Sequence, residues 1–138
     1  MVQQQVIVWD LETVPNLEAA ARLFDMVGSP AEDVWAALGG GFPKLPLHKI
    51  VCIGVLIASR EQEGWSVDAL GSGHLGQRSE KELITDFVAK IGELRPQLVT
   101  FNGSSFDLPV LRYRAMVNRV MATGLQVRPY FHRYADDA

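Results

Sequence analysis

The run Gln5-Val6-Ile7-Val8-Trp9 most limits how this chain can fold, because it is a short β-branched and aromatic stretch that stops at an acidic step. A run that is apolar on both faces is typical of a central strand covered on both sides. We expect the strand to end at Asp10-Leu11-Glu12. Two residues apart on an extended chain, the Asp10 and Glu12 side chains project from the same face of the sheet. The chain therefore begins with a buried strand that carries two carboxylates at its carboxyl end.

The segment from residue 14 to residue 48 is predicted to be an insertion of two short helices. The second helix is expected to use Ser29 as its N-cap and Pro30 as its first residue, with Glu32 reaching back. Glycines 39 to 41 should terminate it.

After the insertion, the pattern predicts a β-hairpin, a helix, a strand and a second helix. The predicted strands are 49–58, 64–70 and 97–101. The first helix begins at the capping box Ser79-Glu80-Lys81-Glu82, and the second runs from near Asp107 to about Thr123. A leading antiparallel meander followed by helix, strand and helix resembles a ribonuclease-H-like layer. The predicted class is α/β, with a mixed sheet flanked by helices, in a single unit without a linker.

Composition excludes several kinds of protein. Thirteen Lys and Arg against 16 Asp and Glu give a net charge of −3, which argues against a basic protein that coats nucleic acid. The single cysteine excludes an internal disulfide framework and a Cys-based zinc site. No apolar run approaches the ~20 residues of a membrane span, and the polar start is not a signal peptide. We therefore expect a cytoplasmic protein without a membrane partner.

Two acidic clusters are candidates for chemistry. The carboxylates of Asp10 and Glu12 repel each other at close range, and a bound cation would offset this repulsion. Because all the ligand atoms would be oxygens, the pair favours Mg²⁺ or Mn²⁺ over zinc. Asn102 and Asp107 follow the last predicted strand, and they would share one end of the sheet with the first cluster if the two strands are neighbours. The bland alternatives stay open. The first pair can be a solvated loop start, Asp107 a helix N-cap, and Phe106 a core residue rather than a stacking surface.

The residues also resemble a known family. Val8-Trp9-Asp10-Leu11-Glu12-Thr13 is similar to the first motif of DEDD-type 3′–5′ exonucleases, and Asn102-x-x-x-Phe106-Asp107 is similar to their second. The likeness is greatest to predicted exonucleases akin to the proofreading domain of family B DNA polymerases. Pro46 to Ile53 and Phe106 to Ala115 also resemble that group, so the resemblance spans nearly the whole chain.

The resemblance implies two-metal hydrolysis of a terminal phosphodiester, with two divalent cations, Mg²⁺ or Mn²⁺, as cofactors. It implies that Asp10 bridges both ions, Glu12 serves the water-activating ion and Asp107 reaches the second. Leu11 and Thr13, through their backbone, and Asn102 and Phe106 would position the terminal nucleotide. The expected partner is nucleic acid with a 3′ end, with single-stranded DNA as the expected form.

The family's third motif, a Tyr or His paired with a fourth carboxylate, is not found. Tyr134 precedes Asp136 and Asp137 by two and three positions rather than four. We therefore expect residues 1–138 to be the N-terminal portion of one exonuclease domain, with weak metal binding and little activity.

Three other interpretations stay open. Asp10-Leu11-Glu12-Thr13-Val14 approximates the first motif of haloacid-dehalogenase-type phosphatases, in which the first Asp is a covalent nucleophile. A non-catalytic nucleic-acid or protein-binding module of the same fold is the second. The third concerns the locally basic last third, which is either a track for a nucleic-acid backbone or a solvated face. Its basic residues are Arg112, Arg114, Arg119, Arg128, His132 and Arg133.

Overall fold

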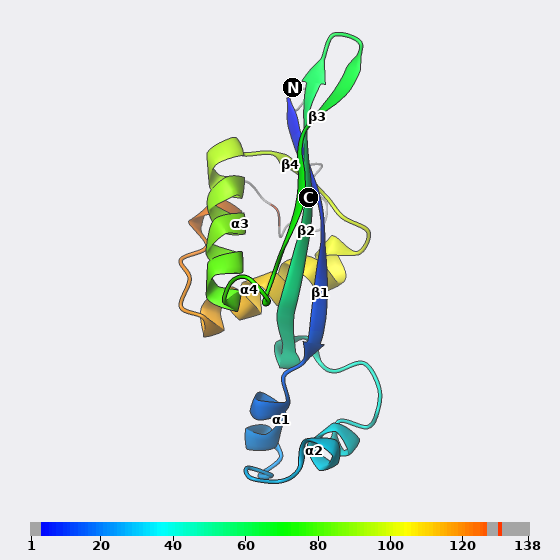
Figure 1. Ribbon diagram of the computed structural model, residues 1–138, viewed down its shortest axis with the longest axis vertical. Helices are drawn as coiled ribbons and strands as arrows, with labels where there is room; N and C mark the ends of the chain where they lie inside the picture. The colour runs from blue at the N-terminus through cyan, green and yellow to red at the C-terminus, as the bar shows by residue number, and fades with distance from the viewer. Residues whose placement is uncertain (1–3, 127–129, 131–138) are drawn as a thin grey trace.

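The computed structural model covers the chain, and it describes residues 4–126 and 130. Its centre is a long four-stranded sheet, with two helices packed beside it and two short helices beyond one end (Figure 1). The strands are β1 (Gln5–Pro15), β2 (His48–Glu61), β3 (Gly64–His74) and β4 (Gln97–Val99). The helices are α1 (Leu17–Leu23), α2 (Ala31–Ala37), α3 (Glu80–Leu94) and α4 (Leu108–Val117), with short turns η1 (Leu45–Leu47), η2 (Gly103–Asp107) and η3 (Thr123–Gln126).

The sheet is mixed, and its strand order is β3-β2-β1-β4. β1 and β2 pair antiparallel, as do β2 and β3, whereas β1 and β4 run parallel. This topology confirms the predicted α/β class with a mixed, helix-flanked sheet. It counts against the phosphatase interpretation, which needs a crossover helix after the first strand rather than a hairpin partner.

β1 differs from its prediction in length and in burial. It runs on to Pro15, because β2 supplies ladder partners as far as the Pro15–His48 pair. Asp10 and Glu12 therefore lie inside the strand, and the predicted end at Asp10-Leu11-Glu12 is wrong. The predicted cover on both faces is also wrong. Ile7 is fully buried, but Val8 on the opposite face is 41% exposed.

The helix ends agree with the predictions only in part. The capping box at Ser79 is confirmed, since its hydroxyl accepts from the Glu82 N–H while the Glu82 carboxylate accepts from the Ser79 N–H. The N-cap of α2 is Pro30 rather than Ser29, and no side chain caps that helix. The last predicted helix ends at Val117 instead of Thr123, and Arg119 just beyond it adopts a positive φ of 56°. That left-handed backbone cannot continue a right-handed helix.

The core lies between one face of the sheet and helices α3 and α4. The odd-numbered side chains of β1 enter it, and Trp9 meets Phe87 of α3 at 4.9 Å between ring centroids. The even-numbered side chains, including Asp10 and Glu12, are on the other face, here called the open face. Within residues 4–126, no helix is long and apolar enough to cross a membrane.

A buried ion pair ties α3, α4 and β2 together. Arg114 of α4 donates from Nε and Nη2 to the two oxygens of Glu80 at 2.8 and 2.7 Å. The same carboxylate accepts from the Ile50 N–H at 2.8 Å and from the Asn118 amide at 3.0 Å. Burial raises the pKa of Glu80, but the hydrogen bonds from Arg114, Asn118 and Ile50 outweigh it, so the net pKa is lowered. This pair fixes how α4 enters the fold.

Candidate functional site

Asp10 and Glu12 are exposed on the open face of β1. Their neighbours on β2 are Gly54 opposite Asp10 and Cys52 opposite Glu12. Because Gly54 has no side chain, the surface beside Asp10 is unobstructed on that strand. The register shifts between Glu12 and Thr13, so a β-bulge follows the acidic pair directly. Bulges redirect neighbouring side chains, and they are frequent next to active sites.

Asp107 reaches β1 where the ladder with β4 has ended. β4 pairs only with Val6 to Val8 of β1, and after Val99 the chain turns through η2 into α4. Gly103 begins that turn in close contact with Thr100, since a Cβ at Gly103 would lie 2.0 Å from the Thr100 methyl group. The close approach is therefore possible only for glycine, and it delivers Asp107 to a buried position that is 2% exposed.

The alternative in which the Asp107 side chain caps a helix is not borne out. The residue occupies the N-cap position of α4, but its backbone is helical and its side chain caps nothing. Burial raises the pKa of this carboxyl, and the negative charge of Asp10 raises it further. The Thr100 hydroxyl and the Leu11 backbone lie near enough to lower the pKa in part. Asp10 and Asp107 are thus within electrostatic reach of each other, although they come from different elements.

Asp107 also leaves a buried oxygen without a partner. Among the described residues, neither its Oδ1 nor Oγ1 of Thr100 makes a hydrogen bond with acceptable geometry. Thr100 and the Leu11 backbone therefore lie close to the carboxyl without satisfying its Oδ1 atom. A buried carboxylate oxygen that lacks a donor, beside a second carboxylate, fits a cation ligand.

Among the described residues, two carboxylates rather than three fit a shared cation site, those of Asp10 and Asp107. In the part of the chain that the structure describes, no group of three or more His, Cys, Asp or Glu side chains is arranged to hold a metal ion. Glu12 shares the open face with Asp10, whereas Asp107 approaches from the buried side near Leu11. The structure thus brings Asp10 and Asp107 within electrostatic reach of each other, and the charge that acts on Asp107 is that of Asp10.

The residues expected to hold a nucleotide border this acidic pair. Thr13 shares a 2.9 Å hydrogen bond with Nδ1 of His48, whose Nε2 lies 3.1 Å from the Pro43 carbonyl oxygen. The His48 ring meets Phe106 edge-on at 5.1 Å, so Thr13 and Phe106 flank the same buried histidine. Phe106 is only partly buried, which agrees with neither a fully buried core residue nor a free surface ring.

Asn102 and Leu11 have less direct roles in the geometry. Asn102 is exposed, and its carbonyl accepts from the N–H groups of Ser105 and Phe106, which starts η2. It lines a cavity of about 330 Å³ beside β4, together with Thr100 and Phe101. The side chain of Leu11 is buried in the core, so only its backbone is available near Asp107.

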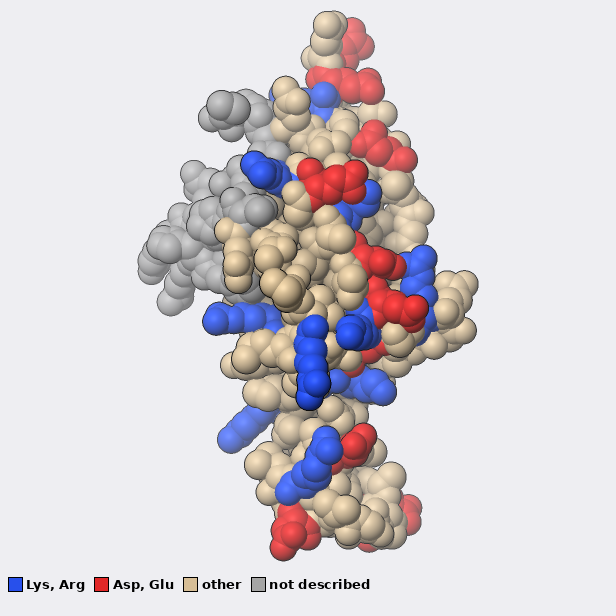
Figure 2. Space-filling model, turned by 90° about the vertical axis from the view of Figure 1, so that its left-hand side faces the viewer, with Lys and Arg blue, Asp and Glu red and all other residues tan. Residues whose placement is uncertain are grey.

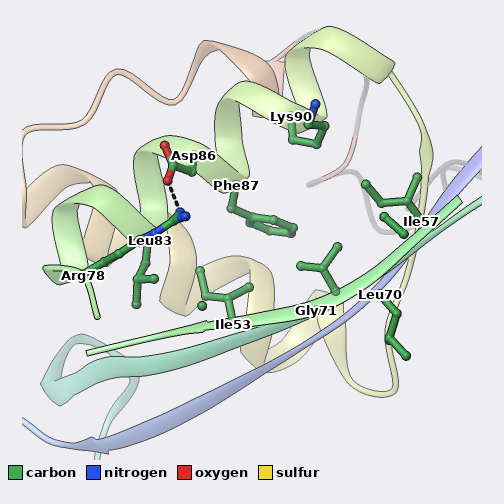
Figure 3. Close-up of a pocket in the computed structure, with 12 residues that line it drawn as sticks. Ile53, Ile57, Leu70, Gly71, Arg78, Leu83, Asp86, Phe87 and Lys90 are labelled. Carbon is green, nitrogen blue, oxygen red and sulfur yellow. Dashed lines mark hydrogen bonds and ion pairs between the residues drawn. The ribbon is translucent and has the colours of Figure 1, made fainter. Parts of the chain in front are cut away.

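A separate apolar cavity of about 300 Å³ lies between β2, β3 and α3 (Figure 3). Ile53 and Phe87 line it, and the ion pair between Arg78 and Asp86 closes one side. It opens on the covered side of the sheet, whereas Asp10 and Glu12 are on the open face. This cavity therefore has no part in the acidic site.

Among the residues that the structure describes, the basic side chains do not form a continuous track. Figure 2 shows Lys and Arg side chains on the α3 side of the molecule, interspersed with Asp and Glu. Lys90 pairs with Glu93 on this side, and Arg114 is buried against Glu80. Arg112 and Arg119 are exposed, and Arg128, His132 and Arg133 lie outside the described residues. The arrangement agrees better with a solvated, mixed-charge surface.

Sequence reasoning missed the residues that support the site from a distance. His48 and Thr13 are 35 positions apart, and no spacing pattern links them. The predicted strand 97–101 includes Thr100, but a strand pattern does not indicate its contact with Gly103. The Glu80–Arg114 pair spans 34 positions and was equally hidden, because Glu80 was seen only as part of a capping box.

A protein-family model described as a predicted 3′-5′ exonuclease related to the exonuclease domain of PolB matches residues 40–137. The match covers more than half of the chain, and it includes Asn102, Phe106 and Asp107 but begins after Asp10 and Glu12. It confirms the family that the two motifs predicted. A search of curated proteins finds no match.

Proposed function

We infer the activity of this chain from the family to which it belongs, the predicted 3′-5′ exonucleases related to the exonuclease domain of PolB. The family supports an exonuclease-like domain whose substrate is nucleic acid. We propose that the domain hydrolyses terminal phosphodiesters from a 3′ end, with the acidic pair Asp10 and Asp107 at its centre. The observation that carries this proposal is the buried, unpartnered oxygen of Asp107 beside the charge of Asp10.

The proposed cation ligands are Asp10, Glu12 and Asp107, with Mg²⁺ or Mn²⁺ as the metal. Divalent cations in such a site offset the carboxylate charge, polarise the scissile phosphate and lower the pKa of a bound water. Asp10 is exposed on the open face, where a phosphate can approach it. Asp107, with its raised pKa, holds a proton more readily than an ordinary Asp does, so cation binding must compete with that proton.

The surrounding residues would orient the substrate. Both ring nitrogens of His48 already have a hydrogen-bond partner, Thr13 at Nδ1 and the Pro43 carbonyl oxygen at Nε2. His48 would therefore hold the Thr13 hydroxyl in place rather than act as a base or a cation ligand. Phe106 presents a partly exposed ring next to Asp107 on which the terminal base can stack. We propose single-stranded DNA as the substrate, since a terminal base that stacks on a ring must be unpaired.

Metal binding provides the direct test. The full chain is titrated with Mn²⁺ and followed by calorimetry, alongside Asp10→Ala and a matched control, Glu61→Ala, which removes an exposed carboxylate at the far end of β2. We expect Asp10→Ala to weaken Mn²⁺ binding at least 10-fold and Glu61→Ala to leave it unchanged. Equal binding by all three proteins would refute the proposed cation site.

A non-catalytic nucleic-acid-binding module is the second candidate, and one observation favours it: Glu12 does not join Asp10 and Asp107 in a three-carboxylate group within the described part. We also expect weak hydrolysis because the third family motif was not found in the sequence, and Tyr134, Asp136 and Asp137 lie outside the described residues. Digestion of 5′-labelled single-stranded DNA by this chain separates the two candidates. Slow, chelator-sensitive shortening from the 3′ end supports a weak exonuclease, and Mn²⁺ binding without any shortening supports the binding module.

A further inference from the structure

Three aromatic rings meet beside the proposed site, two from residues 42–48 and one from η2. Phe42, from the loop before η1, lies 4.8 Å from His48 and 5.4 Å from Phe106 between ring centroids, and His48 lies 5.1 Å from Phe106. The tilts are 47°, 57° and 79°, so no ring covers another face to face. We call these three residues the aromatic cluster.

The exposure of Phe42 is unusual for a ring with two aromatic neighbours. Its side chain is 75% exposed, whereas His48 is buried and Phe106 is half-buried. A phenylalanine that served only to close the core would bury most of its surface. Phe42 instead keeps most of its ring open to solvent while its inner edge is fixed by the other two rings.

The base of the cluster is rigid. His48 is held at both ring nitrogens, by Thr13 and by the Pro43 carbonyl oxygen next to Phe42 in the chain. The insertion is closed behind it by a 2.7 Å hydrogen bond from the Asn16 N–H to the Leu47 carbonyl oxygen. A preformed aromatic surface binds with little loss of side-chain freedom.

The position of the cluster connects it to the acidic pair. Thr13 follows Glu12 directly in β1, and Phe106 precedes Asp107 in η2, so both elements that hold the acidic residues also contact the cluster. A nucleotide whose phosphate lies at Asp10 and Asp107 would have its base, or that of its neighbour, within reach of these rings. Exposed rings bind bases of any sequence, because every base has a π-face.

We propose that Phe42 forms a second base-stacking subsite, which takes an unpaired nucleobase next to the one at Phe106. This inference rests on the proposed function, and it gives the insertion of residues 16–47 a part in substrate binding. The ligand class is a single-stranded oligonucleotide, held by stacking rather than by sequence-specific hydrogen bonds.

The test measures binding of fluorescein-labelled, short oligothymidine to the full chain, by anisotropy, with Ca²⁺ present in place of Mg²⁺. We expect Phe42→Ala to bind ~10-fold more weakly, which is near the lower end of the range for one stacked base. Phe42→Trp should retain wild-type affinity, and Phe42→Leu should bind as weakly as Phe42→Ala, because leucine keeps apolar surface but offers no π-face. The matched control is Phe24→Ala, which removes another exposed ring from the same insertion.

An abasic nucleotide provides the ligand-side arm of the same experiment. An abasic nucleotide at the position that stacks on Phe42 should weaken binding by the wild type. It should leave binding by Phe42→Ala unaffected, because in that variant the phenyl ring on which the base stacks is already absent. Wild-type affinity in Phe42→Ala or in Phe42→Leu would overturn the subsite.

Mn²⁺ titration of the same variants distinguishes a failure of the Phe42 subsite from a failure of the proposed cation site. Phe42→Ala should bind Mn²⁺ as the wild type does. If Asp10→Ala loses Mn²⁺ while Phe42→Ala keeps full oligonucleotide affinity, the cation site stands and only the subsite is refuted.

Discussion

Replacement of Glu80 by alanine should destabilise this protein more than removal of any surface carboxylate. Glu80 and its partner Arg114 are 6% and 4% exposed, so neither charge is solvated by water when the other is lost. The carboxylate accepts hydrogen bonds from Arg114, from the Ile50 N–H and from Asn118. All these donors lose a partner in Glu80→Ala, and the hydrogen bond from the Ile50 N–H is buried.

The expected loss follows from two terms. An unpaired buried guanidinium costs about 3–5 kcal/mol, and an orphaned buried N–H costs about 1–3 kcal/mol. Since terms within one network are not additive, we expect a total of about 4–6 kcal/mol. The free energy of unfolding of a domain is typically about 5–15 kcal/mol, so the variant should be near the limit of stable folding.

Urea unfolding provides the assay, with fluorescence of the buried Trp9 as the probe. The matched control is Glu93→Ala, which removes an exposed ion pair with Lys90 and should cost about 0–1 kcal/mol. Replacing Glu80 and Arg114 together with Leu and Met should cost less than Glu80→Ala alone, because no charge is left unpaired. If Glu80→Ala lost no more stability than Glu93→Ala, the reasoning from the buried pair would be wrong.

The same pair predicts a pH dependence. The folded pKa of Glu80 lies below its ordinary value of 4.5, so its stabilising contribution is complete above that value. The contribution is lost as the pH falls through the folded pKa. The stability difference between wild type and Glu80→Ala should therefore shrink in acid, and a constant difference down to low pH would contradict this origin.

Three further predictions concern the site. The folded pKa of Asp107 is raised above 3.8, so its carboxyl stabilises the fold at low pH and loses that contribution as the pH rises through the folded pKa. Asp107→Asn should therefore be more stable than wild type in urea unfolding at neutral pH. A stability below that of the wild type at neutral pH would contradict this. Gly103→Ala should cost about 1–3 kcal/mol because its methyl group would clash with Thr100, whereas Gly71→Ala, where a Cβ has no neighbour within 4 Å, serves as the control. Mn²⁺ at ~100 times its Kd should stabilise the wild type by about 2.7 kcal/mol in thermal unfolding but not Asp10→Ala, and equal stabilisation of both would place the ion elsewhere.

The sequence was sufficient for features that depend on local pattern. Alternation and capping signals predicted the class, the succession of strands and helices along the chain from the hairpin onward, and the helix capped by Ser79. The Asp-x-Glu spacing predicted that Asp10 and Glu12 share a face. The family was predicted from two short motifs, and the family match confirms it. These features need only neighbouring residues to be read together.

Features that depend on long-range pairing were not accessible in the same way. β1 was predicted to end at the acidic step Asp10-Leu11-Glu12, but pairing with β2 keeps it extended to Pro15. Asp107 was weighed as an N-cap from its position before Leu108-Pro109. Its burial, and the charge of Asp10 beside it, follow from where the chain turns after β4. Tertiary position decides such roles, and one sequence does not reveal it.

The way in which the insertion joins the sheet has a consequence for how this protein can change. Pro15 and His48 are ladder partners, so β1 and β2 stay paired up to the point where the chain departs and returns. Lengthening or shortening the intervening segment would alter a loop that is already closed, and the entropy of a closed loop varies only slowly with its length. The strands that hold the acidic residues would keep their register throughout. Segments grafted at this junction should therefore change what the domain contacts while Asp10 and Glu12 keep their places in β1.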